Sequence, residues 1–221
     1  MSAAVPRPPV AIMLAGLVLA LGITQLGLPG LIAPGEGIGA RVAREAIWFA
    51  IGGAVLLWVV QVERLPLASI GLRRPTAGTF GWAALATIAL IASVMLSYAL
   101  ILPALGLEMN MGMTKRIVDV PVWLMMLTAL RAGIVEEILF RGYPIERIEA
   151  LTGNRWLAAI VPGGIFILAH LGSWGPGQLI VVAFGAVILT ALYLWRRDLP
   201  CVMIAHAAAD LIGFTLARLQ S

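Results

Sequence analysis

The chain has 221 residues, of which 61% are hydrophobic and only 12% are charged, and its mean hydropathy is +1.00. Soluble domains carry about a quarter charged residues, so this composition excludes the soluble class and predicts an integral membrane protein. The net charge of +4 does not indicate nucleic-acid binding, because the basic residues are dispersed in short loops between apolar segments and form no patch.

Apolar segments recur along the whole chain. A helix needs about 20 mostly apolar residues to cross a bilayer. The candidate segments are 10–28, 45–62, 80–102, 121–141, 156–172, 177–195 and 200–218. The first is longer than the apolar part of a signal peptide, which is usually about 7 to 15 residues, so it is interpreted as a span. We therefore expect an all-α, polytopic transmembrane helical bundle of about seven to eight spans, with residues 1–221 forming one integral domain of the cell membrane.

Two stretches between these segments are predicted to be connectors. The stretch that begins at Leu105 and runs through Lys115 and Arg116 is too short and too polar to span, which favours an interfacial helix. Residues 142–155 predict a short charged helix that ends at Gly153 and has Pro144 near its first turn.

Basic residues are distributed unequally between alternate loops. One side carries nine of them: Arg7, Arg64, Arg73, Arg74, Arg141, Arg147, Arg155, Arg196 and Arg197. The other side carries five: Arg41, Arg44, Lys115, Arg116 and Arg218. Because cytoplasmic loops are enriched in Lys and Arg, this asymmetry predicts a cytoplasmic N-terminus. Arg131 is left inside the fourth span.

The fourth span also contains a compact group of ionisable residues. Charged side chains in hydrocarbon cost roughly 2.5 to 3.5 kcal/mol each on insertion scales, so they indicate a functional interior. Arg141 follows Glu137 by four residues, and on a helix the two can pair. Glu136 is rotated from Glu137 by about 100° and does not share that partner. Glu136 is therefore the candidate general base, with Glu137 and Arg141 in a supporting role. The simpler alternative is one interfacial ion-pair cluster.

The only two histidines of the chain lie in later apolar segments. His170 has Phe166 one helical turn before it, where the ring can pack beside the imidazole. His206 has Asp210 one turn after it, and a carboxylate that accepts from an imidazole N–H fixes its tautomer. Either histidine alone is better explained by interhelical hydrogen bonding, whereas two histidines together with buried acids favour a site. The single cysteine, Cys201, is expected to be buried packing.

The ordered motifs resemble a known family. They are Glu-Glu-x-x-x-Arg at 136–141, Phe-x-x-x-His at 166–170 and His-x-x-x-Asp at 206–210. In this order on successive apolar segments they resemble the CPBP family, which comprises the CAAX proteases and bacteriocin-processing enzymes, also called Abi proteins or type II CAAX prenyl endopeptidases. Ile-Gly-Leu-Arg-Arg-Pro at 70–75 is similar to the cytoplasmic lead-in of bacterial members. The resemblance covers about residues 65–218 as a catalytic core.

The resemblance implies an intramembrane peptidase, a hydrolase whose cavity opens to the cytoplasm. It implies that Glu136 activates a water with help from His170, while Glu137 and Arg141 brace it. It also implies that His206 and the residue at 210 stabilise the oxyanion. The eukaryotic prenyl peptidases have asparagine where this chain has Asp210, and an ionised aspartate cannot donate a hydrogen bond. Asp210 is therefore either protonated or serves by orienting His206.

The expected substrate is a peptide or a membrane-associated protein, prenylated or not, and no cofactor is expected. Three alternatives remain open. Two histidines and one glutamate could bind a catalytic zinc, although the sequence has no His-Glu-x-x-His spacing. A non-catalytic scaffold or immunity protein of the same family could bind a partner through the cavity. A proton-coupled transporter could use the acids and histidines as a relay.

Overall fold

The computed structural model describes residues 7–108 and 111–220, and these residues form helices and loops only. The α-helices are α1 Val10–Leu17, α2 Ile23–Gln25, α3 Leu28–Ile32, α4 Ile38–Leu57, α5 Ala77–Leu96, α6 Leu102–Ala104, α7 Met111–Val118, α8 Val122–Arg131, α9 Tyr143–Thr152, α10 Arg155–Ala169, α11 Leu171–Arg196 and α12 Leu199–Leu219. The π-helical segments are η1 Val18–Gly22, η2 Trp58–Val62, η4 Ser97–Ile101, η5 Ala132–Glu136 and η6 Ile138–Gly142, and η3 Leu67–Ile70 is a 3₁₀ turn. The predicted all-α bundle is confirmed.

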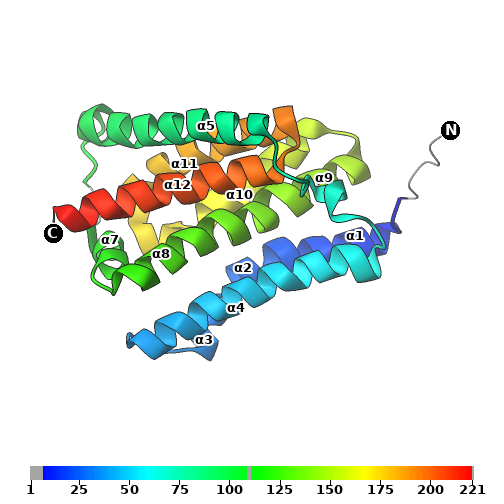
Figure 1. Ribbon diagram of the computed structural model, residues 1–221, viewed down its shortest axis with the longest axis horizontal. Helices are drawn as coiled ribbons and strands as arrows, with labels where there is room; N and C mark the ends of the chain where they lie inside the picture. The colour runs from blue at the N-terminus through cyan, green and yellow to red at the C-terminus, as the bar shows by residue number, and fades with distance from the viewer. Residues whose placement is uncertain (1–6, 109–110, 221) are drawn as a thin grey trace.

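The helices run back and forth along one axis, so α1 begins and α12 ends at opposite ends of the bundle (Figure 1). α4 lies along one edge with α1, and α5 lies along the other edge (Figure 1). α12 contacts both α5 and α8, as well as the π-helical turn η5, and is therefore central to the bundle. The end that holds the N-terminus also holds α9, and the opposite end holds α3, α7 and the C-terminus (Figure 1).

All seven predicted segments are helical, but they differ in length. Four described helices are long and apolar enough to cross a membrane: Ile38–Val62, Ala77–Ala104, Leu171–Arg196 and Leu199–Leu219. A fifth is added if Met111–Val118 and Val122–Thr152, which meet at a bend of 119°, are counted as one span. The segments Val10–Gln25 and Arg155–Ala169 are shorter apolar helices. The fold is that of a polytopic membrane protein.

The predicted connectors take the expected form where the structure describes them. α7 contains the second half of the 105–116 stretch and meets α8 at a sharp bend, whereas residues 109–110 of this prediction lie outside the described residues. α9 ends at Gly153, whose φ of 67° suits glycine, and Pro144 lies in its first turn. The helical path is also broken at Gly175, which has a φ of 78° and lies inside α11, shortly after the end of α10.

Asp198, the N-cap residue of α12, makes two contacts that fix the start of this helix. Asp198 accepts a hydrogen bond from the backbone N–H of Cys201 at 3.2 Å, which satisfies one of the free donors of the first turn. The same carboxylate accepts from the Thr79 hydroxyl of α5 at 2.7 Å, which ties the two helices together. Cys201 is fully buried, as predicted. These contacts fix the position of α12 along α5, and His206 lies two turns into this helix.

Candidate active site

The four residues predicted to be catalytic come together at one cavity. Glu136, His170, His206 and Asp210 all line a cavity of about 1170 Å³ in the middle of the bundle. They come from η5, from the junction of α10 and α11, and from α12. The cavity therefore brings together side chains that are more than 70 positions apart in the sequence. Glu137 and Arg141 do not line the cavity and are fully buried behind it. The two neighbouring glutamates therefore have different environments.

The cavity reaches one end of the bundle. Its lining includes residues of α3 and α7 as well as Gln220, and these elements lie at the end opposite the N-terminus (Figure 1). Several of the lining residues at that end, among them Glu36, Met111 and Arg116, are exposed. None of the described residues of α9 or η3, at the other end, lines it. Access from water is therefore at the end of α7.

Arg131 holds Glu136, a contact that the sequence reasoning missed. The Arg131 Nη1 group donates to Glu136 Oε1 at 2.5 Å, although the two residues are five positions apart. On an α-helix five residues correspond to a rotation of about 140°, which would point the two side chains apart. The chain between them is π-helical, and its wider turn brings positions i and i+5 onto one face. From the sequence alone, Arg131 is only a charge inside a predicted span.

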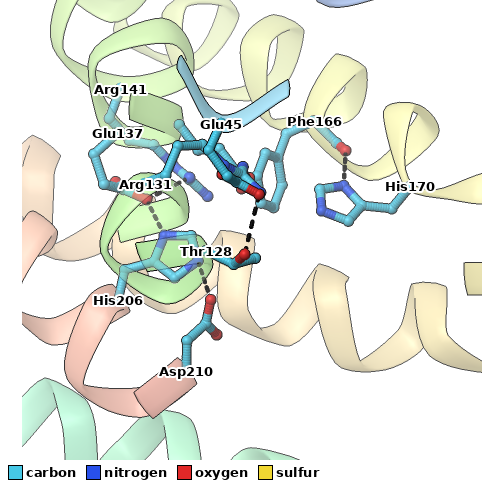
Figure 2. Close-up of polar contacts among 10 residues, drawn as sticks. Glu45, Thr128, Arg131, Glu137, Arg141, Phe166, His170, His206 and Asp210 are labelled. Carbon is cyan, nitrogen blue, oxygen red and sulfur yellow. Dashed lines mark hydrogen bonds and ion pairs between the residues drawn. The ribbon is translucent and has the colours of Figure 1, made fainter. Parts of the chain in front are cut away.

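Arg131 has a second acidic partner, Glu45 of α4. Its Nε donates to Glu45 Oε2 at 2.8 Å, and the Thr128 hydroxyl donates to Glu45 Oε1 at 3.0 Å (Figure 2). The sequence offered one signal for this contact, since Glu45 is an acidic residue at the start of an apolar segment. It offered none for the partner, because 86 residues separate Glu45 from Arg131.

The predicted pair between Glu137 and Arg141 is confirmed. Arg141 Nη1 donates to Glu137 Oε1 at 2.8 Å, and both side chains have no exposed surface. The guanidinium also lies over the ring of Phe166, 4.4 Å from its centre, which stabilises a buried cation. Arg141 belongs to the π-helical turn η6, and Glu137 is the residue directly before this turn.

His206 is oriented by Glu137, which differs from the predicted partner. Its Nδ1 lies 2.7 Å from Glu137 Oε1, whereas its Nε2 lies 3.7 Å from Asp210 Oδ2, beyond hydrogen-bond distance (Figure 2). Because a carboxylate only accepts, Nδ1 carries the hydrogen in this contact. The prediction that Asp210 fixes the ring by a direct hydrogen bond is therefore wrong. The Glu137 carboxylate accepts the hydrogen bond that fixes the ring.

His170 lies at the C-terminal end of α10. Its ring packs against Phe166, as predicted, with 4.5 Å between the ring centres. Its Nδ1 lies 2.7 Å from the carbonyl oxygen of Phe166 (Figure 2). A carbonyl only accepts, so Nδ1 is the donor and the neutral ring keeps a lone pair on Nε2. This tautomer suits a ring that accepts a hydrogen bond from water.

A glycine lets η5 approach α12 closely enough to bring Glu136 beside His206. A Cβ on Gly133 would lie 2.6 Å from both the backbone nitrogen and the Cβ of Ala207. Small residues at a helix crossing permit backbone contact of this kind in membranes. His206 directly precedes Ala207 and Glu136 follows Gly133 by three residues, so this contact brings the segments that contain them together.

We expect Gly133→Ala to destabilise the protein by about 1–3 kcal/mol, because the added methyl group must push α12 away. Thermal unfolding in detergent measures the loss. Gly163→Ala is the matched control, since a Cβ there meets nothing within 4 Å. Equal unfolding midpoints for the two variants would contradict the close contact.

The described residues provide no preformed metal site. No group of three or more His, Cys, Asp or Glu side chains within residues 7–108 and 111–220 is arranged to hold a metal ion. The zinc alternative would require the two histidines and a glutamate to rearrange.

Comparison with known proteins gives one match. Residues 118–212 match the family model described as type II CAAX prenyl endopeptidase Rce1-like. This range contains all of the predicted site residues from Glu136 to Asp210, and it excludes Glu45. The comparison with curated proteins found no match, and neither did the comparison with solved structures.

Proposed function

We propose that this membrane protein, whose residues 118–212 match the type II CAAX prenyl endopeptidase Rce1-like family model, is an intramembrane endopeptidase that uses a glutamate-activated water. The observation that supports the proposal most is the division between the two glutamates. Glu136 lines the water-accessible cavity with both histidines, whereas Glu137 is buried behind it. In this proposal the Glu136 carboxylate faces the substrate, and the Glu137 carboxylate holds His206 and Arg141 in place.

Glu136 is the proposed general base. Its Oε1 accepts from Arg131, which holds the carboxylate in place and leaves Oε2 for a water in the cavity. That water attacks the carbonyl carbon of the scissile bond while Glu136 takes its proton. His170 accepts the second hydrogen of the water through Nε2 and so orients it. When the C–N bond breaks, Glu136 returns the proton to the leaving amine, and the products are a carboxylic acid and an amine, between which a proton then redistributes.

His206 is the proposed oxyanion partner. With Nδ1 hydrogen-bonded to Glu137, an imidazolium would present its Nε2–H to the cavity and donate to the oxygen of the tetrahedral intermediate. Asp210 Oδ2, at 3.7 Å from Nε2, favours this cationic form by charge and not by a direct hydrogen bond. The proposed substrate is a peptide or a membrane-associated protein, prenylated or not.

Cleavage of a mixed peptide library by the purified protein in lipid, with and without a chelator, tests the proposal. Cleavage that resists the chelator is expected. Cleavage that the chelator abolishes would favour the zinc enzyme in its place. No cleavage, from a folded protein and a library that includes prenylated peptides, would contradict the peptidase and favour the scaffold.

The orientation in the membrane is a second part of the proposal. Helix direction alternates, so the nine-residue basic group lies at the N-terminal end and the five-residue group at the α7 end. We propose that the N-terminal end is cytoplasmic. The cavity reaches the α7 end, so it then opens to the outer face. A cytoplasmic N-terminus and a cavity open to the cytoplasm, both expected from the sequence, are incompatible with each other in this fold.

Thiol labelling in cells checks the orientation. Cys201 is the only cysteine and is buried, so a Cys201→Ala background is suitable for single new cysteines. Ala77 and Ala104 mark the two ends of one span, and both are exposed. An impermeant thiol reagent should label Ala104→Cys in intact cells and Ala77→Cys only after permeabilisation. The reverse pattern would place the cavity on the cytoplasmic side.

A further inference from the structure

The N-terminal helix α4 contributes to the site although it lies outside the family-matched range 118–212. Glu45 is buried, and it accepts hydrogen bonds from Arg131 and from Thr128. Buried charges are costly to keep in a membrane unless they are paired, and Glu45 is paired with the Arg131 guanidinium. Its partner Arg131 is also the residue that holds Glu136.

One face of α4 is shaped to reach the site. Trp48 is one helical turn after Glu45, and the Arg131 guanidinium lies 5.8 Å from the centre of its ring. Gly52 is one turn further, and a Cβ there would lie 3.3 Å from the side chain of Val135, directly beside Glu136 in sequence. Val55, on the same face, is fully buried. A small residue thus lets the helix come close while an acid and an aromatic ring contact Arg131.

We infer that Glu45 is a positioning residue which, through Arg131, fixes the orientation of the Glu136 carboxylate. Arg131 has a single planar guanidinium, and it uses Nε for Glu45 and Nη1 for Glu136. Charge-assisted contacts on two different nitrogens fix the plane of the group as well as its position. Without Glu45, Arg131 would keep its contact with Glu136 but would lose the restraint that sets its angle. The N-terminal helices therefore complete the site.

The inference rests on the proposed peptidase activity, and kinetics of purified variants test it. Glu45 also lines the cavity, but both of its carboxylate oxygens already accept hydrogen bonds from Arg131 and Thr128. Glu45→Ala is therefore expected to lower kcat at least tenfold and to change KM less than twofold. In an Arg131→Ala background the same substitution should lower kcat by less than a further twofold, since Glu45 acts only through Arg131. Losses that multiply in the double variant, or a normal kcat in a folded Glu45→Ala protein, would overturn the inference.

Glu63→Gln is the matched control. Glu63 is also a buried acid outside the family-matched range, it pairs with Arg147 at 2.6 Å, and it does not line the cavity. Its variant should unfold at a lower temperature but keep the kcat of the wild type. A tenfold loss of kcat in this variant would show that any buried ion pair of the N-terminal part has the same effect, which would overturn a specific role for Glu45.

A stability cycle separates this inference from the proposed function. The unfolding midpoints of Glu45→Ala, Arg131→Ala and the double variant should show strong coupling whether or not the wild type cleaves a peptide. If the wild type is inactive but the coupling is present, the proposed function fails and the contact between α4 and Arg131 stands. Independent, additive midpoints would overturn the inference even for an active enzyme.

Discussion

Glu136→Gln is expected to lower kcat for peptide cleavage by roughly 10²–10⁴-fold, the usual contribution of a general base. Glutamine keeps the size of the side chain and an oxygen that accepts from Arg131, but it cannot take a proton from water. The unfolding midpoint should change little, since Glu136 borders the cavity and is not enclosed in the core. Steady-state kinetics and thermal unfolding of the same preparation measure both quantities.

Two further variants sharpen this result. His170→Ala should also abolish cleavage, because the ring that orients the water is lost, while its fold should persist. Glu149→Gln is the matched control, since Glu149 pairs with Arg197 on the far side of the bundle and does not line the cavity. A fully active Glu136→Gln protein would rule out Glu136 as the base, and inactivity of Glu149→Gln would show that the assay responds to general damage.

Arg141→Met is expected to cost about 3–5 kcal/mol of stability, because it leaves the fully buried Glu137 without its cationic partner. The double variant Glu137→Gln with Arg141→Met should recover much of this loss, since no uncompensated charge remains. Unfolding in lipid or mild detergent, followed by circular dichroism over a range of denaturant, measures the difference.

The double variant also tests the role of Glu137 in the site. His206 would then be held by a neutral amide oxygen, so cleavage should stay below the wild-type rate although stability returns. Arg155→Met is the control, as this exposed arginine lies outside the buried network. If Arg141→Met unfolds like the control, the buried pair is not the structural element that its geometry indicates.

Local spacing explains which parts of the site were predictable. The pair between Glu137 and Arg141 and the ring contact between Phe166 and His170 join residues four positions apart. A helix brings such residues together whatever surrounds it, so the sequence contains the contact. The apolar segments, the all-α class and the short helix ended by Gly153 follow from composition and turn chemistry in the same way.

Contacts between helices were not predictable. Arg131 reaches Glu136 through a π-helical turn, and the ordinary helical period would have separated them. Glu45 meets Arg131, and Glu137 displaces Asp210 as the partner of His206, because the packing of α4 and α12 against η5 sets these distances. The cavity opens at the α7 end for a similar reason, as helix order alone does not say which end is filled.

The sequence by itself thus determined a membrane bundle and which residues carry acid and base groups, because hydrophobicity and helical period are local properties of the chain. Only the tertiary structure decided which charged groups meet, since Glu45, Arg131 and Glu136 are partners across 86 and five residues with no shared period. Charges in a membrane interior must find a partner, but the packing of helices chooses which one.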